Sequence, residues 1–174
     1  MWSGVLATPN RRIVLAGFMG TGKSTVGRLA AIALGWCFID MDAEIVVQEG
    51  MSIPDLFAQR GESAFRQIER EVLHQVLDRD EAVIATGGGA LIDADNRAYA
   101  AAHSLLICLS AHPDTLPARL AGDSARPLLK GDWRALLDRR RAAYDSIMYQ
   151  VDTTDKSAQQ AAGEVLKIWY SVST

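Results

Sequence analysis

The sequence predicts an α/β protein, a three-layer doubly wound sandwich with a central parallel sheet of about five strands. Two observations support this fold class. Short apolar runs alternate with longer stretches of helical periodicity along most of the 174 residues, and the apolar runs are unbroken. Unbroken runs are typical of parallel strands that are covered on both faces. We expect a single domain over residues 11–174, after an N-terminal extension at 1–10.

The expected elements alternate along the chain. Strands are predicted at 12–16, 36–39, 82–85 and 105–109, with a weaker one at 150–153. Helices are predicted at 23–34, 62–79, 132–148 and 157–170. The first of these helices ends at Gly35, a suitable C-cap. Because ligands of such sheets bind beyond the carboxyl ends of the strands, motifs at those positions have the greatest weight.

Composition and charge argue against several function classes. Hydrophobic residues make up 49% of the chain and charged residues 22%, and the formal net charge is −3. Without a basic excess we expect neither a nucleic acid nor a membrane as a partner, so an anionic ligand would need local arginines. Cys37 and Cys108 both lie in apolar runs, which predicts two reduced core thiols and fits a cytoplasmic protein. We also expect a monomer.

Residues 17–24, Gly-Phe-Met-Gly-Thr-Gly-Lys-Ser, match the phosphate-binding pattern G-x-x-x-x-G-K-[ST]. The match follows the first strand and opens the first helix, where backbone N–H groups form a nest for an anion. Lys23 would then reach the β- and γ-phosphates of a nucleotide, and Ser24 would ligate Mg²⁺. The alternative, a glycine-rich turn with an unrelated lysine, does not explain this context. The predicted nucleotide-binding residues of the loop are Gly20, Thr21, Gly22, Lys23, Ser24 and Thr25.

Two carboxylates, Asp40 and Asp42, follow the second predicted strand. Residues i and i+2 of an extended segment face the same way, so both side chains would face the phosphate-binding loop. One could hold Mg²⁺ through water, and the other could accept a proton from a substrate hydroxyl. The alternative is that one of them only caps the helix that starts at Ala43.

Arg66 and Glu69 lie three residues apart in the long helix at 62–79, so they can pair on one face. Spacing alone favours an exposed ion pair without a function. The functional alternative is an arginine that Glu69 holds in place, so that its planar guanidinium binds a carboxylate through two hydrogen bonds.

Three glycines, Gly87, Gly88 and Gly89, follow the third predicted strand. Bare backbone at the carboxyl end of a strand lets a ligand approach closely and accept hydrogen bonds from N–H groups. The alternative is a flexible loop.

The segment at 117–130 is predicted to be a mobile lid, because its middle is small and polar. Arg126 precedes a proline and should be extended. On a closing loop its guanidinium could neutralise charge on the transferring phosphoryl group. Further on, neighbouring residues of a helix differ by about 100° in direction, so one site cannot receive all of Arg139, Arg140 and Arg141.

Together these motifs resemble the shikimate kinase family over about residues 12–154, in the family's order. The resemblance rests on GFMGTGKSTVGR at 17–28, FIDMD at 38–42, SIPDLFAQRGESAFRQIE at 52–69, ATGGGA at 85–90, RPLL at 126–129 and the R-x-x-x-Y spacing of Arg140 and Tyr144. It implies a P-loop NTPase fold like that of the nucleoside monophosphate kinases, ATP and Mg²⁺ as cofactors, and a substrate-binding region at about 42–70.

The resemblance also implies roles at the nucleotide. Lys23 matches the residue that contacts the phosphates, and Arg126 matches a lid arginine that reaches them. Ser24 and Asp40 match positions at the metal, and Arg119 matches an arginine that lies against adenine.

For the substrate, Asp42 matches the aspartate that contacts the shikimate hydroxyls and is the proposed base. The implied catalytic residues are thus Asp42, Lys23 and Arg126. Arg66 and Arg140 match the arginines that hold the shikimate carboxylate, and Glu69 matches the partner of the first arginine. Gly88 and Gly89 match backbone donors to the substrate.

Three functions compete. The leading prediction is ATP-dependent phosphorylation of the 3-hydroxyl of shikimate. The second is a related kinase of another hydroxy acid, such as gluconate. The resemblance at Arg66, Arg140 and the Arg-Pro-Leu-Leu segment argues against it. A non-catalytic nucleotide-binding module should have lost some of the charged groups of phosphoryl transfer, and the sequence has no N-K-x-D stretch for guanine.

Overall fold

The computed structural model describes residues 11–120 and 132–173. Within them five strands form one sheet in the order β2-β3-β1-β4-β5, and each neighbouring pair is parallel. The strands are β1 (Arg12–Ala16), β2 (Cys37–Asp40), β3 (Ala82–Ala85), β4 (Leu105–Ser110) and β5 (Tyr149–Asp152). The predicted doubly wound α/β fold is confirmed, and each strand boundary agrees with its prediction to within a residue.

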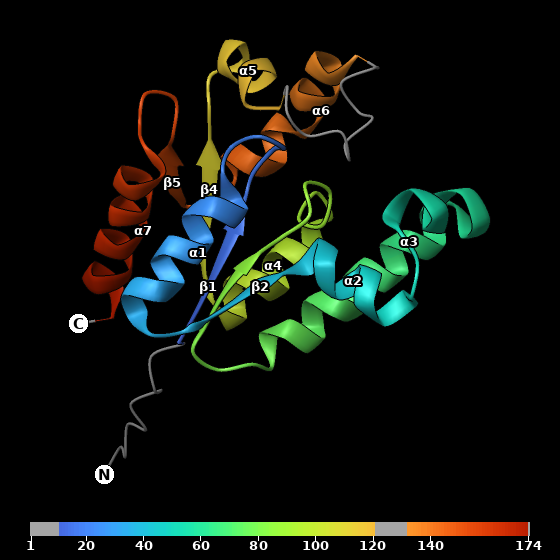
Figure 1. Ribbon diagram of the computed structural model, residues 1–174, viewed down its shortest axis with the longest axis horizontal. Coiled ribbons are helices and arrows are strands. Elements are labelled where there is room, and N and C mark those ends of the chain that lie inside the picture. The colour runs from blue at the N-terminus through green and yellow to red at the C-terminus, as the bar shows by residue number, and fades with distance from the viewer. Residues whose placement is uncertain (1–10, 121–131, 174) are drawn as a thin grey trace.

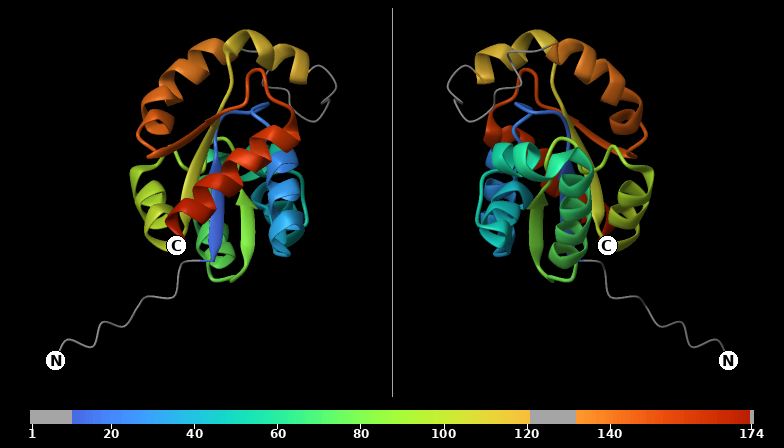
Figure 2. Two further views of the ribbon diagram at one scale, coloured as in Figure 1. Left: turned by 90° about the vertical axis from the view of Figure 1, so that its left-hand side faces the viewer. Right: turned by 90° about the vertical axis from the view of Figure 1, so that its right-hand side faces the viewer.

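Helices cover both faces of this sheet (Figures 1 and 2). α1 (Lys23–Leu34) and α7 (Ala158–Val172) pack against each other on one face. α3 (Ile53–Leu77) and α4 (Ala94–His103) pack together on the other. The remaining described helical segments are α2 (Met41–Glu49), the short 3-10 helix η1 (Pro113–Thr115), α5 (Leu116–Leu120) and α6 (Trp133–Asp145). No helix in the described part of the chain is long and apolar enough to cross a membrane.

The central strand β1 separates two hydrophobic cores. Ile13 and Leu15 point into the core beneath α1 and α7, whereas Val14 and Ala16 point into the core beneath α3 and α4. All four are almost completely buried. Successive side chains of a strand point to opposite faces, so an unbroken apolar run is what a strand covered on both faces requires.

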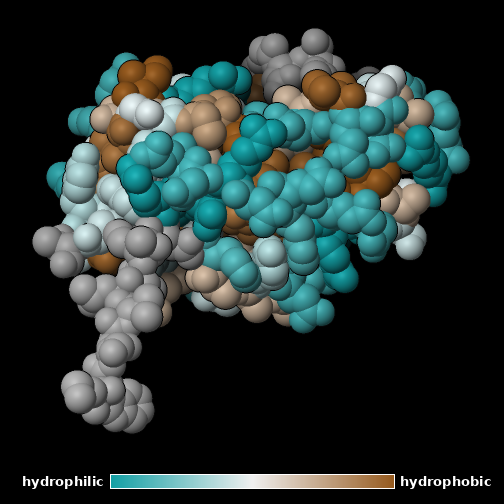
Figure 3. Space-filling view, turned by 90° about the horizontal axis from the view of Figure 1, so that it is seen from below, coloured by the Kyte–Doolittle hydropathy of each residue, from teal (hydrophilic) through white to brown (hydrophobic). Residues whose placement is uncertain are grey.

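The strand order places the ligand-binding edge. From β1 the chain first moves toward one edge of the sheet, to β2. From β3 it crosses β1 to β4 and continues toward the other edge, so the direction of winding changes at the neighbouring strands β1 and β3. The loops after β1, β2 and β3 therefore meet at the carboxyl edge of the sheet, the upper edge in Figure 1. The opposite end of the molecule is mostly hydrophilic, with hydrophobic residues in separate spots (Figure 3).

Two sequence-based predictions need correction. The helix predicted at 62–79 begins earlier, at Ile53, and contains a non-helical residue, Gly61, just before the predicted start. Ser52 caps the earlier segment by accepting a hydrogen bond from the Asp55 N–H at 3.3 Å. The second correction concerns Cys37, which is exposed because it begins the edge strand β2. Cys108 is buried as predicted, and burial raises the pKa of its thiol to about 12.

Candidate active site

The phosphate-binding loop connects β1 to α1, as predicted. Gly22 precedes α1 with φ of 96°, a left-handed conformation that favours glycine. Glycine has no side chain that could cap the helix, so the first backbone N–H groups of α1 remain available to an anion. Thr21 closes the loop from within, because its Oγ1 donates a hydrogen bond to the Phe18 carbonyl at 2.8 Å.

Lys23 lies at the base of this loop and is only 8% exposed. Its Nζ donates to the carbonyl oxygens of Gly17 at 2.8 Å and Phe18 at 3.0 Å. These bonds hold the amine at the loop, where it can meet a phosphate that the backbone N–H groups bind.

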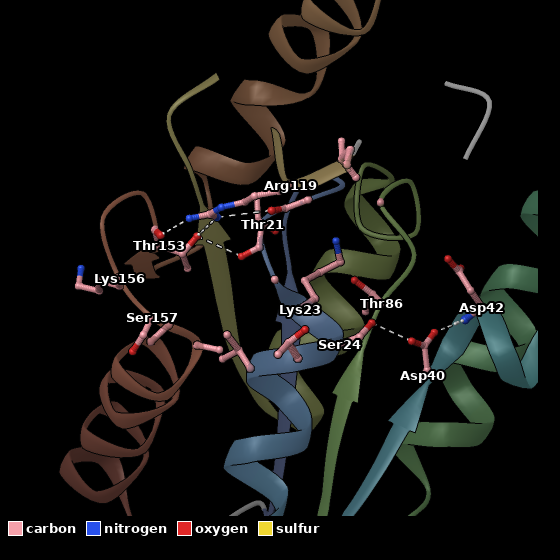
Figure 4. Close-up of a pocket in the computed structure, with 18 residues that line it drawn as sticks. Thr21, Lys23, Ser24, Asp40, Asp42, Thr86, Arg119, Thr153, Lys156 and Ser157 are labelled. Atoms are coloured by element: carbon pink, nitrogen blue, oxygen red, sulfur yellow. Dashed lines mark hydrogen bonds between the residues drawn. The ribbon is translucent and has the colours of Figure 1, made fainter. Parts of the chain in front are cut away.

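Ser24 and the two aspartates lie beside Lys23 (Figure 4). Ser24 Oγ donates to Asp40 Oδ2 at 2.8 Å, and the other oxygen of Asp40 accepts from the Asp42 N–H at 3.1 Å. Asp40 therefore caps α2 and also contacts Ser24, so the capping and functional interpretations are compatible. The expectation that both aspartates lie on an extended segment is wrong, because Asp42 is in the first turn of α2.

The oxygens of Ser24 and Asp40 offer hard ligands of the kind that Mg²⁺ prefers. Among the described residues, no three His, Cys, Asp or Glu side chains gather in a group that could hold a metal. The pair fits a metal that takes few protein ligands and completes its shell with water and phosphate.

One cavity of about 370 Å³ joins the loop to both aspartates. It includes all six loop residues that the sequence analysis assigned to the nucleotide, from Gly20 to Thr25, together with Gly88 and Arg119. At its far end lie Thr153, Lys156 and Ser157, which the sequence analysis did not identify. No motif marks this segment in the sequence, because its residues line the cavity only through the way β5 leads into α7.

Arg119 and Thr153 connect this far end to the phosphate-binding loop. The Arg119 guanidinium donates to Thr153 Oγ1 at 2.9 Å and to the carbonyls of Thr153 and Thr154 at 2.6 and 3.0 Å. Thr153 is 3% exposed, and its hydroxyl lies 3.1 Å from the Thr21 carbonyl and 2.9 Å from the Ser110 carbonyl. Figure 4 shows this chain of bonds above Lys23.

The Arg66–Glu69 pair lies on α3 and is not an ordinary exposed ion pair. Arg66 Nη1 lies 2.6 Å from Glu69 Oε2, and the side chain of Glu69 is 3% exposed, against 36% for Arg66. Burial raises the pKa of Glu69, while the charge and hydrogen bond of Arg66 oppose that rise. A buried carboxylate thus holds one edge of an arginine that reaches solvent, the arrangement that the functional interpretation requires.

The three glycines leave room for charged side chains that lie close to their backbone. A Cβ at Gly87 would lie 2.6 Å from Asp42 Oδ1 and 3.1 Å from Glu69 Oε1. A Cβ at Gly89 would collide with the Arg66 guanidinium. The close approach of these side chains explains why glycine is needed here. The sequence analysis predicted a close approach too, but by a ligand.

Of the three consecutive arginines on α6, Arg140 faces the glycines. Its Nη1 donates to the Gly88 carbonyl at 3.1 Å. Arg141 instead pairs with Asp138 at 2.8 Å, and both side chains are mostly exposed. Arg139 is exposed at the rim of a second cavity of about 450 Å³, whose lining also contains Arg66, Gly89 and Arg140.

The predicted lid is only partly described. Residues 117–120 belong to α5, and Leu120 is buried. The remainder of the lid, including Arg126 and the Arg-Pro-Leu-Leu segment, lies outside the described residues.

This site defines a class of protein. A phosphate-binding loop at the carboxyl edge of a parallel sheet, with carboxylates at the end of β2 and the start of α2, is the arrangement of a P-loop phosphotransferase. A family model described as shikimate kinase matches residues 19–169. The chain belongs to the shikimate kinase family.

Individual relatives agree with that assignment. A shikimate kinase of Salinibacter ruber is 42% identical over 171 residues, which cover 90% of this chain and 83% of the relative. The structure of a shikimate kinase from Acinetobacter baumannii in complex with shikimate superposes with a TM-score of 0.87 and 35% identity, covering 93% of this chain and 94% of the other. A gluconokinase from Sinorhizobium meliloti, at 17% identity and a TM-score of 0.54 over 97% of this chain and 100% of its own, shares only the fold.

Proposed function

We propose that this protein transfers the γ-phosphate of ATP to the 3-hydroxyl of shikimate, giving ADP and shikimate 3-phosphate. The observation that supports this substrate is the position of Arg66 and Arg140, on either side of the triple glycine and next to the phosphate-binding loop. A small molecule with a carboxylate at one end and hydroxyls at the other would meet two guanidinium groups and then Asp42. Membership of the shikimate kinase family supports the same substrate.

At the nucleotide end, the loop N–H groups and Lys23 bind the β- and γ-phosphates. Arg119 lies against the adenine end of the cavity, beside Thr153. Ser24 and Asp40 would hold Mg²⁺, which would neutralise charge on the phosphate oxygens. From the lid, Arg126 would contact the same phosphates.

At the acceptor end, Arg66 and Arg140 hold the carboxylate, and the backbone N–H groups of Gly88 and Gly89 donate to the substrate. Asp42 orients the 3-hydroxyl and accepts its proton. A bond forms between that oxygen and the γ-phosphorus while the bond from the γ-phosphorus to the bridging oxygen breaks, and ADP leaves with the electron pair. Positioning supplies much of the rate in phosphoryl transfer, so the distant carboxylate contacts contribute to catalysis by aligning the hydroxyl.

One chain supplies every residue named here, so we expect a monomer to be active. The decisive experiment measures ADP release from ATP and Mg²⁺ with shikimate, with gluconate or without an acceptor. We expect release to depend on shikimate. Release with gluconate alone would contradict the assigned acceptor, and release that no acceptor stimulates would contradict the kinase assignment.

A further inference from the structure

Tyr144 lies one helical turn after Arg140 on α6. Its phenolic oxygen donates to the Gly88 carbonyl at 2.6 Å, so that carbonyl accepts hydrogen bonds from both Tyr144 and Arg140. The Tyr144 side chain is buried in the core beneath α3 and α4, with 7% of the residue exposed. Burial raises the pKa of Tyr144 to about 12, so the phenol keeps its proton and remains a donor at neutral pH.

The Gly88 carbonyl and the Gly89 N–H belong to the same peptide unit. The unit is planar and trans, so its C=O and N–H point in opposite directions. Two donors on α6 draw the carbonyl toward that helix, and the N–H must then point away from it. No described residue accepts a hydrogen bond from the Gly89 N–H, so this donor is available to a ligand.

A peptide between two glycines needs such a restraint. Neither residue has a Cβ that would limit rotation of the unit, so alternative orientations have a low steric cost. A single hydrogen bond from Arg140 would be a weak restraint, because the same guanidinium is needed for the substrate carboxylate. The Tyr144 phenol is a neutral donor fixed by the surrounding core, and it does not compete for the substrate.

We propose that Tyr144 is a positioning residue that, through the Gly88 carbonyl, holds the Gly89 N–H toward the bound acceptor and leaves Arg140 free to bind the carboxylate. This inference rests on the proposed function. It deepens that function by assigning the orientation of the glycine backbone to a side chain that lines neither cavity.

The test is Tyr144→Phe, which keeps the ring in the core and removes only the hydroxyl. Loss of one buried hydrogen bond predicts a rise of about 10-fold in the KM for shikimate, with the KM for ATP unchanged. Tyr149→Phe is the matched control, because Tyr149 is a partly buried tyrosine on β5 that lines neither cavity. An unchanged KM for shikimate, or an equal rise in both KM values, would overturn the proposal.

A second measurement does not depend on turnover. In protein labelled with ¹⁵N-glycine and free of ligands, we expect the Gly89 amide signal to broaden in Tyr144→Phe, because the peptide then exchanges between orientations. Gly163, on the distant helix α7, serves as the internal reference. An unbroadened Gly89 signal would overturn the positioning role, whereas a wild-type protein inactive with shikimate would instead overturn the proposed function.

Discussion

The two ends of the site are built in different ways. The nucleotide end consists mainly of consecutive residues, from Gly17 to Ser24, held by the loop's own hydrogen bonds to the Phe18 and Gly17 carbonyls. The acceptor end is assembled from α3, the loop after β3 and α6. Arg66 of α3 lies against Gly89, and Arg140 of α6 bonds the Gly88 carbonyl. A backbone-based anion site can therefore be recognised locally, whereas a carboxylate site needs the whole fold to bring its arginines together.

The sharpest test of the nucleotide end is Lys23→Ala. We expect kcat to fall by about 1,000-fold or more, because the charge on the transferring phosphate loses its nearest amine. A coupled assay of ADP release at saturating shikimate measures this. Lys167→Ala, on the exposed surface of α7, is the control and should leave kcat unchanged. A normal kcat in Lys23→Ala would refute the assigned role of the loop.

At the acceptor end, Arg66→Lys keeps the charge but loses the planar fork. We expect the KM for shikimate to rise about 10- to 100-fold with the KM for ATP unchanged, since only the carboxylate contact is altered. Arg60→Lys is the matched control, because Arg60 is on the same helix, pairs with Glu49 and lines neither cavity. Equal effects of the two substitutions on the KM for shikimate would contradict the assignment of Arg66 to the substrate site.

Glu69→Gln separates stability from function. Burial raises the pKa of Glu69 above its ordinary value of 4.5, so the folded protein disfavours the ionised form and loses stability as pH rises through the folded pKa. Glutamine cannot ionise. We therefore expect the variant to be more stable relative to wild type at about pH 7.5 than at pH 4.5. Urea denaturation at the two pH values measures this as a larger difference in the free energy of unfolding, variant minus wild type, at the higher pH.

The same variant should raise the KM for shikimate by about 3- to 10-fold, because a neutral amide holds Arg66 less firmly than a carboxylate does. For stability, a Glu69→Gln variant that loses more stability relative to wild type at about pH 7.5 than at pH 4.5 would contradict the raised pKa of Glu69. In that case the ion pair with Arg66 would outweigh the cost of burial.

The smallest effect is expected for Arg141→Ala. Arg141 pairs with Asp138 on the exposed side of α6, and exposed pairs contribute about 0–1 kcal/mol. Both KM values and kcat should stay within about 2-fold of wild type. Arg140→Ala, one position away, should raise the KM for shikimate at least as much as Arg66→Lys. A reversed order would mean that Arg141, not Arg140, serves the acceptor end.

The sequence was most informative where structure depends on local residues. The five strands and the phosphate-binding loop follow from apolar runs and a contiguous motif, and these predictions are confirmed. The position of Asp42 was harder, because an aspartate after a strand can continue the strand or open a helix. Ile53 starts a helical segment that apolar periodicity does not reveal, although Ser52 with a proline two residues later is a helix-start signal.

Contacts between distant segments could not be predicted from spacing. Thr153 reaches the phosphate-binding loop from the other end of the chain, and its burial depends on how β5 packs beside β4. Likewise, helical spacing alone does not say which of the three arginines on α6 faces the site. Only the family resemblance singled out Arg140, which lies beside the Gly88 carbonyl. Cys37 was misplaced because an apolar run does not show which strand lies at a sheet edge.

The most direct test of the proposed carboxylate site compares shikimate with its methyl ester, which keeps the hydroxyls and removes the carboxylate charge. In wild-type protein we expect the ester to raise the acceptor KM by about 10- to 100-fold and to leave the KM for ATP unchanged. Because both changes remove one contact, Arg66→Lys should impose little further penalty on the ester. An ester used as well as shikimate, or an Arg66→Lys penalty that is the same for both acceptors, would contradict the account.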